Sequence, residues 1–170
     1  MIDIKSIEKM KKLPNRGKNP CFGCGPSNPY GLRMAFYTDG VSVFSPLSIP
    51  GHLCGWNDLA HGGVISTVLD EAMSWAAISL LGRYILTRSM TVDFLRPVWI
   101  KRQIVAEARV MEKVNERDAV MEGAIYDDTG ALCARSQGRY ALFTLEGINR
   151  LNLFDAEVLE SFDDVFRAIG

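Results

Sequence analysis

The sequence has little of what marks several large classes of protein. It holds only two histidines and four cysteines in 170 residues, and four cysteines are too few for a disulfide-stabilised scaffold. Its 19 basic residues are balanced by 20 acidic ones, so the chain lacks the positive charge that dominates nucleic-acid binding. We therefore do not expect nucleic acid as a partner.

Long hydrophobic runs are also missing. The two uncharged stretches around the most apolar part of the chain, 59–69 and 72–82, are each about half of the roughly 20 apolar residues that a membrane span needs. The first twelve residues mix lysines with isolated apolar residues and lack the apolar centre of a signal peptide. We expect no membrane partner, and we expect a cytoplasmic protein whose cysteines stay reduced.

The order of hydrophobic patterns predicts one domain over 1–170. Periodicity predicts a long, almost wholly apolar helix at 62–81 and shorter amphipathic helices at 3–12 and 154–168. Strands are predicted at 32–38, 41–47, 84–97, 102–114, 118–127 and 131–145. The last four are spaced as in an antiparallel meander. We therefore expect an α+β fold in which a curved antiparallel sheet wraps the long helix, with free edges that dimerisation would cover.

The most informative stretch is His61-Gly62-Gly63 at the start of the long helix. Backbone N–H groups at a helix N-terminus have no partner within the helix, and the helix dipole is positive there. These groups could stabilise negative charge on a carbonyl oxygen, as an oxyanion hole does. The alternative is that the two glycines only make a tight turn.

Two acidic residues lie further along the same helix. Asp70 falls two turns in, at the border between the apolar stripe and a small polar arc that includes Ser66. A carboxylate in such surroundings is costly unless it is paired or used, so Asp70 is either a satisfied structural group or a functional one. Glu71 points about 100° away, and we expect it at an edge with a basic partner.

With two further motifs, this pattern resembles a known family. The strand predicted after the helix contains Val92-Asp-Phe-Leu-Arg-Pro97, and the loop before the helix contains Cys21-Phe-Gly-Cys-Gly25. Taken with His61-Gly-Gly63 and Asp70, these motifs are similar to those of hotdog-fold acyl-CoA thioesterases of the phenylacetate-pathway (PaaI-like) group. The resemblance covers about 20–145, and 1–19 and 146–170 would be an N-terminal and a C-terminal helical extension.

The resemblance implies the hotdog fold and a homodimer whose active sites lie at the subunit interface, with a tetramer also open. It also implies hydrolysis of acyl-CoA to free acid and coenzyme A without a cofactor. It implies that Asp70 is the general base or the nucleophile. The Gly63 N–H, with that of Gly62, would hold the thioester oxygen, and His61 would orient the carbonyl or close the turn. Thr87 would position water or the carboxylate of the other subunit.

Other residues are candidates for substrate binding. By the resemblance, Asn57 matches a polar residue that precedes the His-Gly-Gly motif in some members, and Ser66 lies on the polar side of the helix. Arg88 and Arg96 could meet the phosphates of coenzyme A, since arginine matches phosphate geometry well. Solvation at the surface is the alternative for each arginine.

The cysteines leave a metal site open. Cys21-x-x-Cys24 is half of a zinc site, and His52 with Cys54 could complete a Cys3His set. His-x-Cys spacing is unusual for structural zinc, and the resembling family needs no metal for catalysis. We therefore expect no catalytic metal and interpret these cysteines as thiols in loops. Cys133, within a strand, is expected in the core.

Two other functions remain as alternatives. A non-catalytic acyl-CoA-binding or sensing protein would keep the pocket without the chemistry, although Asp70 argues against it. An enoyl-thioester hydratase or dehydratase would need a histidine and a carboxylate placed together as acid and base. The sequence disfavours this arrangement because His61 belongs to the turn and His52 to a distant loop.

Overall fold

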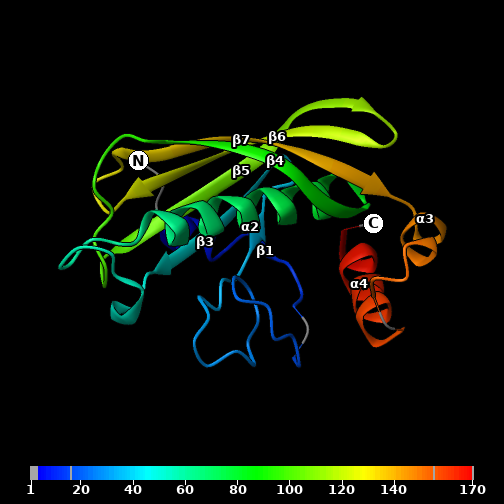
Figure 1. Ribbon diagram of the computed structural model, residues 1–170, viewed down its shortest axis with the longest axis horizontal. Coiled ribbons are helices and arrows are strands. Elements are labelled where there is room, and N and C mark those ends of the chain that lie inside the picture. Colours follow the sequence, from blue (N-terminus) through cyan, green and yellow to red (C-terminus); the bar gives the residue numbers. More distant parts are fainter. Residues whose placement is uncertain (1–3, 16, 155, 170) are drawn as a thin grey trace.

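A long central helix packed against one face of an antiparallel sheet forms the centre of the fold (Figure 1). The computed structural model describes residues 4–15, 17–154 and 156–169. The helix is α2, Gly62–Leu81. The strands are β1 Lys11–Lys12, β2 Tyr37–Thr38, β3 Ser42–Ser48, β4 Tyr84–Phe94, β5 Gln103–Asn115, β6 Asp118–Asp127 and β7 Leu132–Phe143. They form a seven-stranded sheet in the order β1-β2-β3-β5-β6-β7-β4, so the expected α+β architecture is confirmed.

Helix α2 begins and ends where its sequence pattern predicts. His61 is its N-cap, and Gly82 ends it in the left-handed conformation with a φ of 61°. Among the described helices, α2 is long and apolar enough to cross a bilayer by length and composition alone, but 67% of its most apolar window is buried inside the fold. Leu69 and Met73 are fully buried in the main core. Packing against the sheet and its covering segments therefore accounts for its apolar character.

The predicted four-strand meander is wrong for its first member. Strands β5, β6 and β7 follow one another across the sheet, but β4 pairs with β7 and lies at the sheet edge. The reason is that β3 already occupies the free side of β5, from Ser48 opposite Gln103 to Ser42 opposite Arg109. The chain leaving α2 therefore forms the other edge of the sheet. Among the described residues, no strand pairs with the outer side of the 11-residue β4.

The N-terminal predictions are also corrected. Of the helix expected at 3–12, only α1, Ile4–Ile7, is helical, and residue 3 lies outside the described residues. Of the strand expected at 32–38, only β2 joins the sheet. The backbone before it hydrogen-bonds the cysteine-containing loop instead, through Leu32 N–H to Phe22 O and Met34 N–H to Gly23 O. This loop covers the side of α2 that faces away from the sheet (Figure 1).

The C-terminal extension contains two helices where one was predicted. Helix α4, Ala156–Ile169, matches the expectation for 154–168, with Asp155 outside the described residues. The short α3, Leu145–Arg150, was missed, although Thr144 caps it by accepting a hydrogen bond from Gly147 N–H. In α4, Phe162 and Phe166 pack edge-on against the Tyr84 ring, each at 5.2 Å between centroids. The helix thereby covers the end of α2 and the start of β4.

Candidate active site

Asp70 is held by two hydroxyl groups from the sheet. Its Oδ1 accepts hydrogen bonds from the Thr87 hydroxyl and the Tyr140 hydroxyl, each at 2.9 Å. Thr87 and Tyr140 lie directly opposite each other on β4 and β7, and a bulge at Arg88 shifts the register just after this pair. A bulge turns neighbouring side chains, so the irregularity belongs to the geometry that aims Thr87 at Asp70.

The contacts leave the two carboxylate oxygens unequal. Within the described ranges, Oδ1 of Asp70 receives both hydrogen bonds and Oδ2 receives none. Burial, together with the nearby Asp70 charge, raises the pKa of Tyr140, so its hydroxyl stays protonated and able to donate. One oxygen is therefore anchored, and the other is available to a water molecule or a substrate.

Tyr140 is the site residue that sequence reasoning missed. It is fully buried, and its ring lies over Gly138, which precedes it by two residues and so faces the same side of β7. A Cβ at Gly138 would come within 2.7 Å of the Tyr140 ring and 3.3 Å of the Met73 side chain. A glycine two positions before a tyrosine in a strand was the available signal.

The N-terminus of α2 differs in one respect from the expected oxyanion hole. His61 closes the turn, because its Nδ1 accepts a hydrogen bond of 2.9 Å from Gly63 N–H, the group expected to bind the thioester oxygen. An accepting Nδ1 carries no proton. The N–H groups of Val64 and Ile65 donate to His61 O, while Gly62 N–H has no hydrogen-bond partner among the described residues. Gly62 is therefore the ready donor in this conformation.

The other predicted residues have partners of their own. Thr87 contacts Asp70 of its own chain. The Ser66 hydroxyl donates to Gly62 O at 3.0 Å, and Asn57 has a φ of 47° in an exposed turn. Arg88 forms an ion pair with Asp118 at 2.6 Å. Arg96 donates to Leu132 O, also at 2.6 Å. Neither arginine contacts Asp70.

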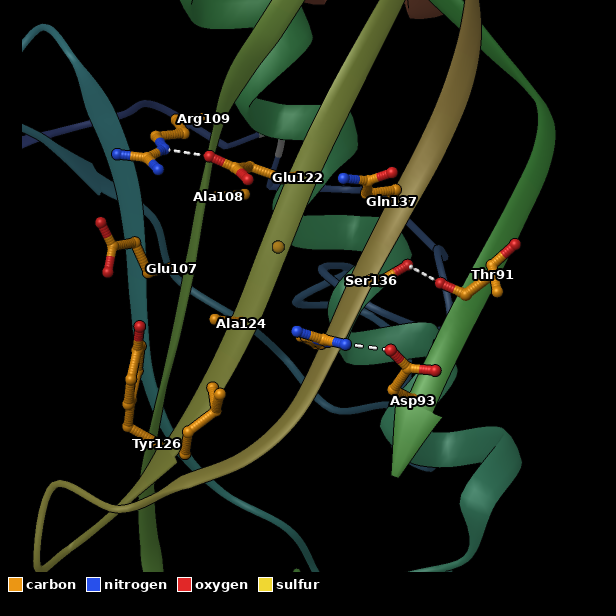
Figure 2. A pocket seen from close by; sticks show the side chains of 13 residues that line it. Thr91, Asp93, Glu107, Ala108, Arg109, Glu122, Ala124, Tyr126, Ser136 and Gln137 are labelled. Carbon is orange, nitrogen blue, oxygen red and sulfur yellow. Dashed lines mark hydrogen bonds and ion pairs between the residues drawn. The ribbon is translucent and has the colours of Figure 1, made fainter. Parts of the chain in front are cut away.

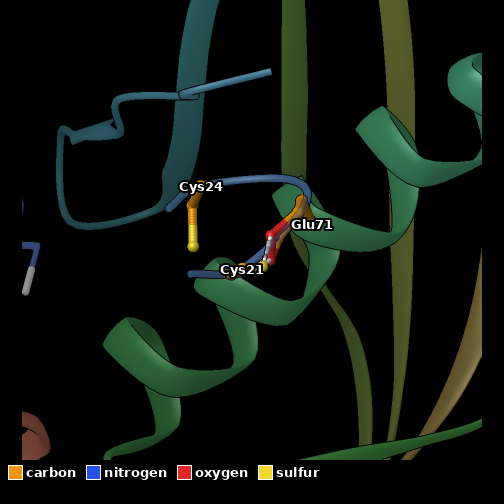
Figure 3. A group of neighbouring side chains, drawn as sticks. All are labelled: Cys21, Cys24 and Glu71. Carbon is orange, nitrogen blue, oxygen red and sulfur yellow. Dashed lines mark hydrogen bonds between the residues drawn. The ribbon is translucent and has the colours of Figure 1, made fainter. Parts of the chain in front are cut away.

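The expected environment of Glu71 is wrong. Glu71 has no basic partner among the described residues and lies under the cysteine-containing loop (Figure 3). Cys21 Sγ donates to its two oxygens at 3.5 and 3.6 Å. Burial raises the pKa of Glu71 to about 8, with a second contribution from the nearby Cys21. Contacts with Cys24 lower the pKa of Cys21.

The proposed Cys3His grouping is also wrong. Cys21, Cys24 and Glu71 bring their sulfur and oxygen atoms within 4.8 Å of one another, and neither His52 nor Cys54 belongs to this group. The His52 ring is instead 3.2 Å from Tyr30 O, and Cys54 is an exposed thiol. Cys133 is buried, as expected.

Two cavities lie away from Asp70. The larger, about 530 Å³, lies on the face of the sheet opposite α2 (Figure 2). Its charged side chains largely neutralise one another, for example in the pairs Arg109–Glu122 and Arg135–Asp93. The smaller, about 200 Å³, lies between α2, the cysteine-containing loop and α4, and Glu71 lines it. Asp70 lines neither.

Solved structures establish the class of fold. AziG of S. sahachiroi is 24% identical, with a TM-score of 0.61 over 67% of this chain and 94% of that one. The E. coli PaaI protein from the phenylacetic acid degradation operon is 19% identical, with a TM-score of 0.60 over 66% of this chain and 81% of that one. A thioesterase from Streptococcus pneumoniae, described as hypothetical and solved with coenzyme A, is 17% identical, with a TM-score of 0.57 over 60% and 81%. The fold is the hotdog fold.

The family model of the thioesterase superfamily matches residues 57–134, from the turn before His61 to the start of β7. This stretch of the chain is therefore similar to the thioesterase superfamily. A comparison with curated proteins found no match.

Replacing His61 tests the cap. We expect His61→Ala to lower the free energy of unfolding by about 1 kcal/mol, because Gly63 N–H loses its acceptor at the helix N-terminus. His61→Asn supplies another capping oxygen and should retain most of that stability. Urea denaturation at one protein concentration measures both. Equal stability of the alanine and asparagine variants would contradict a capping role.

Proposed function

We propose that this protein is an acyl-CoA thioesterase of the PaaI-like group, which hydrolyses a thioester to a free acid and coenzyme A. The observation that carries the proposal is the Asp70 carboxylate, anchored through one oxygen by Thr87 and Tyr140 two turns after a Gly-Gly helix start. The similarity of residues 57–134 to the thioesterase superfamily supports it. So do the titles of similar structures: one S. pneumoniae protein was solved with coenzyme A and also as Asp-to-Ala and Thr-to-Ala variants.

The chemistry needs few groups. A thioester carbonyl is electrophilic and its thiolate leaves without strong acid assistance, so one carboxylate and oriented N–H donors are enough. The free Oδ2 of Asp70 would take a proton from water or attack the carbonyl directly. Gly62 N–H would stabilise the developing oxyanion, and Gly63 N–H would join it if the His61 ring releases it. The proposed reaction uses no cofactor.

The site would be completed by a second subunit. Asp70 and Thr87 lie beside β4, whose outer edge is not paired within the described chain. Phe94, at the end of β4, is 55% exposed and lies next to Gly62, where an added Cβ would be 3.6 Å from its ring. A long exposed strand edge and an exposed aromatic ring favour association. We therefore propose a homodimer that joins two β4 edges and encloses acyl-CoA between subunits.

Arg88 and Arg96 remain candidates for the coenzyme A phosphates. Both are exposed in the single chain, and Asp118 also lies 3.8 Å from Arg139, so it keeps a basic partner if Arg88 turns to a phosphate. Exchanging Asp118 for a phosphate is therefore inexpensive. Asn57 and Ser66 would contribute polar contacts on the same side as the helix start.

Replacing Asp70 tests the function. In a free-thiol assay across short, medium, long and aryl acyl-CoA substrates, we expect hydrolysis by the wild type. Asp70→Asn should lower kcat by at least about a thousandfold, because the amide can neither accept a proton from water nor attack the carbonyl. Circular dichroism should show an unchanged fold.

Asp128→Asn is the matched control, since Asp128 is exposed in the turn between β6 and β7, and it should keep wild-type activity. Thiol release by Asp70→Asn at the wild-type rate would overturn the role of Asp70. If folded wild type binds acyl-CoA but releases no thiol, the protein is a binding or sensing protein. Water addition to an enoyl thioester would instead show a hydratase.

Measuring the molar mass tests the assembly. Light scattering during size-exclusion chromatography should give at least about 38 kDa, twice the 18.9 kDa of the chain, at micromolar concentration. A tetramer would also contain the β4 dimer. A fully active species of 18.9 kDa would show that one chain holds a complete site.

A further inference from the structure

A second polar cluster lies on a different side of α2 from the Asp70 contacts, about 100° around the helix, and the proposed reaction does not use it. It consists of Cys21, Cys24 and Glu71, whose sulfur and oxygen atoms lie within 4.8 Å of one another (Figure 3). The two thiols come from the loop before β2, and the carboxylate comes from α2. The cluster therefore joins two segments that are 47 residues or more apart in sequence.

The distances in the cluster suit a tetrahedral metal ion. Zinc holds thiolate sulfur at about 2.3 Å and carboxylate oxygen at about 2.0 Å, which places two such ligand atoms about 3.5 Å apart. Cys21 Sγ lies 3.5 and 3.6 Å from the two Glu71 oxygens. The ligand atoms of all three residues lie within 4.8 Å of one another, so Cys24 Sγ needs only a short movement to reach the same ion.

The backbone of the loop is shaped closely around the carboxylate. A Cβ at Gly23 would lie 2.1 Å from the Glu71 side chain, and one at Gly25 would lie 2.4 Å from backbone atoms of Asn19 and Cys21. Only glycine fits these positions without displacing the loop. The Cys21-Phe-Gly-Cys-Gly25 sequence is therefore built to hold both sulfur atoms against Glu71.

Neighbouring N–H groups could support thiolate ligands. Asn19, which is 3% exposed, places its amide nitrogen 3.4 Å from Cys24 Sγ, and the Trp75 indole N–H also interacts with this sulfur. Hydrogen bonds of this kind orient metal ligands and stabilise their charge. In contrast, no Lys, Arg or His forms an ion pair with Glu71 in the described part of the chain. A half-buried carboxylate beside two thiols and without a cation is an arrangement that a metal ion would complete.

We propose that Cys21, Cys24 and Glu71 bind one zinc ion, with the fourth coordination position open to the adjacent cavity. Two soft sulfur ligands favour zinc over calcium or magnesium, which take oxygen ligands. The cavity of about 200 Å³ is lined by all three residues and by apolar side chains of α2 and α4, and it can admit a water molecule as the fourth ligand. Binding displaces the protons of the two thiols to solvent.

The site would tie the loop to the helix next to the catalytic residue. Glu71 follows Asp70 directly, and the loop covers α2 through buried Cys24, Met34 and Phe36, the last stacked on Trp75 at 4.9 Å between centroids. Bound zinc would therefore stabilise the loop and the middle of α2 together. It would act as a structural clamp, separate from the proposed hydrolysis at Asp70.

Cobalt and zinc binding to the reduced, metal-free full chain test the proposal. One equivalent of Co²⁺ should produce the thiolate-to-metal charge-transfer band and the visible bands of a tetrahedral site, and zinc should displace it and raise Tm. Glu71→Gln, which keeps the side-chain shape, should weaken Co²⁺ binding more than about 100-fold, beyond the usual effect of losing an outer-shell partner. Cys54→Ser, which changes a thiol outside the cluster, should bind as the wild type does.

A second measurement needs no variant. Alkylation followed by peptide mass spectrometry should show Cys21 and Cys24 protected in the zinc-loaded protein and reactive in the metal-free protein, with Cys54 reactive in both. The proposal is wrong if reduced wild type gives no thiolate-to-metal band, or if the two thiols only form a disulfide. It is equally wrong if Glu71→Gln binds Co²⁺ as tightly as Cys54→Ser. None of these readouts depends on thioesterase activity.

Discussion

The fold depends on enclosing α2. Twelve of the 20 residues of α2 are buried, and a sheet can cover only one side of a helix. The sheet covers one side through β3 to β7, and the loop before β2 and α4 cover much of the rest. The two extensions beyond the superfamily match are therefore parts of the same core. Val165 of α4, for example, is 3% exposed within it.

Two carboxylates interrupt this apolar helix, and their neighbours explain how they are tolerated. Asp70 and Glu71 point about 100° apart, so they meet different coverings. Asp70 reaches the edge of the sheet, where two opposed hydroxyls donate to it. Glu71 reaches the loop, where two thiols surround it. The same helix thus presents a proposed hydrolytic group to β4 and a proposed metal ligand to the loop.

Local features were predictable from sequence because local chemistry determines them. The ends of α2 follow from His61 and Gly82, and the strand boundaries of β6 follow from the turns around it. Strand pairing was less predictable. Strand β4 pairs with β7 because β3 already pairs with the side of β5 that β4 would otherwise occupy. The resemblance singled out Asp70 and Thr87. Their hydrogen bond, and the contribution of Tyr140 70 residues later, depend on contacts between distant segments.

The central claim is that Asp70 performs the hydrolysis and that Tyr140 acts through it. Single-turnover hydrolysis of acyl-CoA should therefore be measured for Tyr140→Phe in the wild-type and Asp70→Asn backgrounds. One hydrogen bond to a charged group is worth about 1.5–3 kcal/mol, so the account predicts a loss of at least about tenfold in the wild type. It predicts no further loss in Asp70→Asn, because residues that act as a unit are not additive. An equal loss in both backgrounds would contradict it.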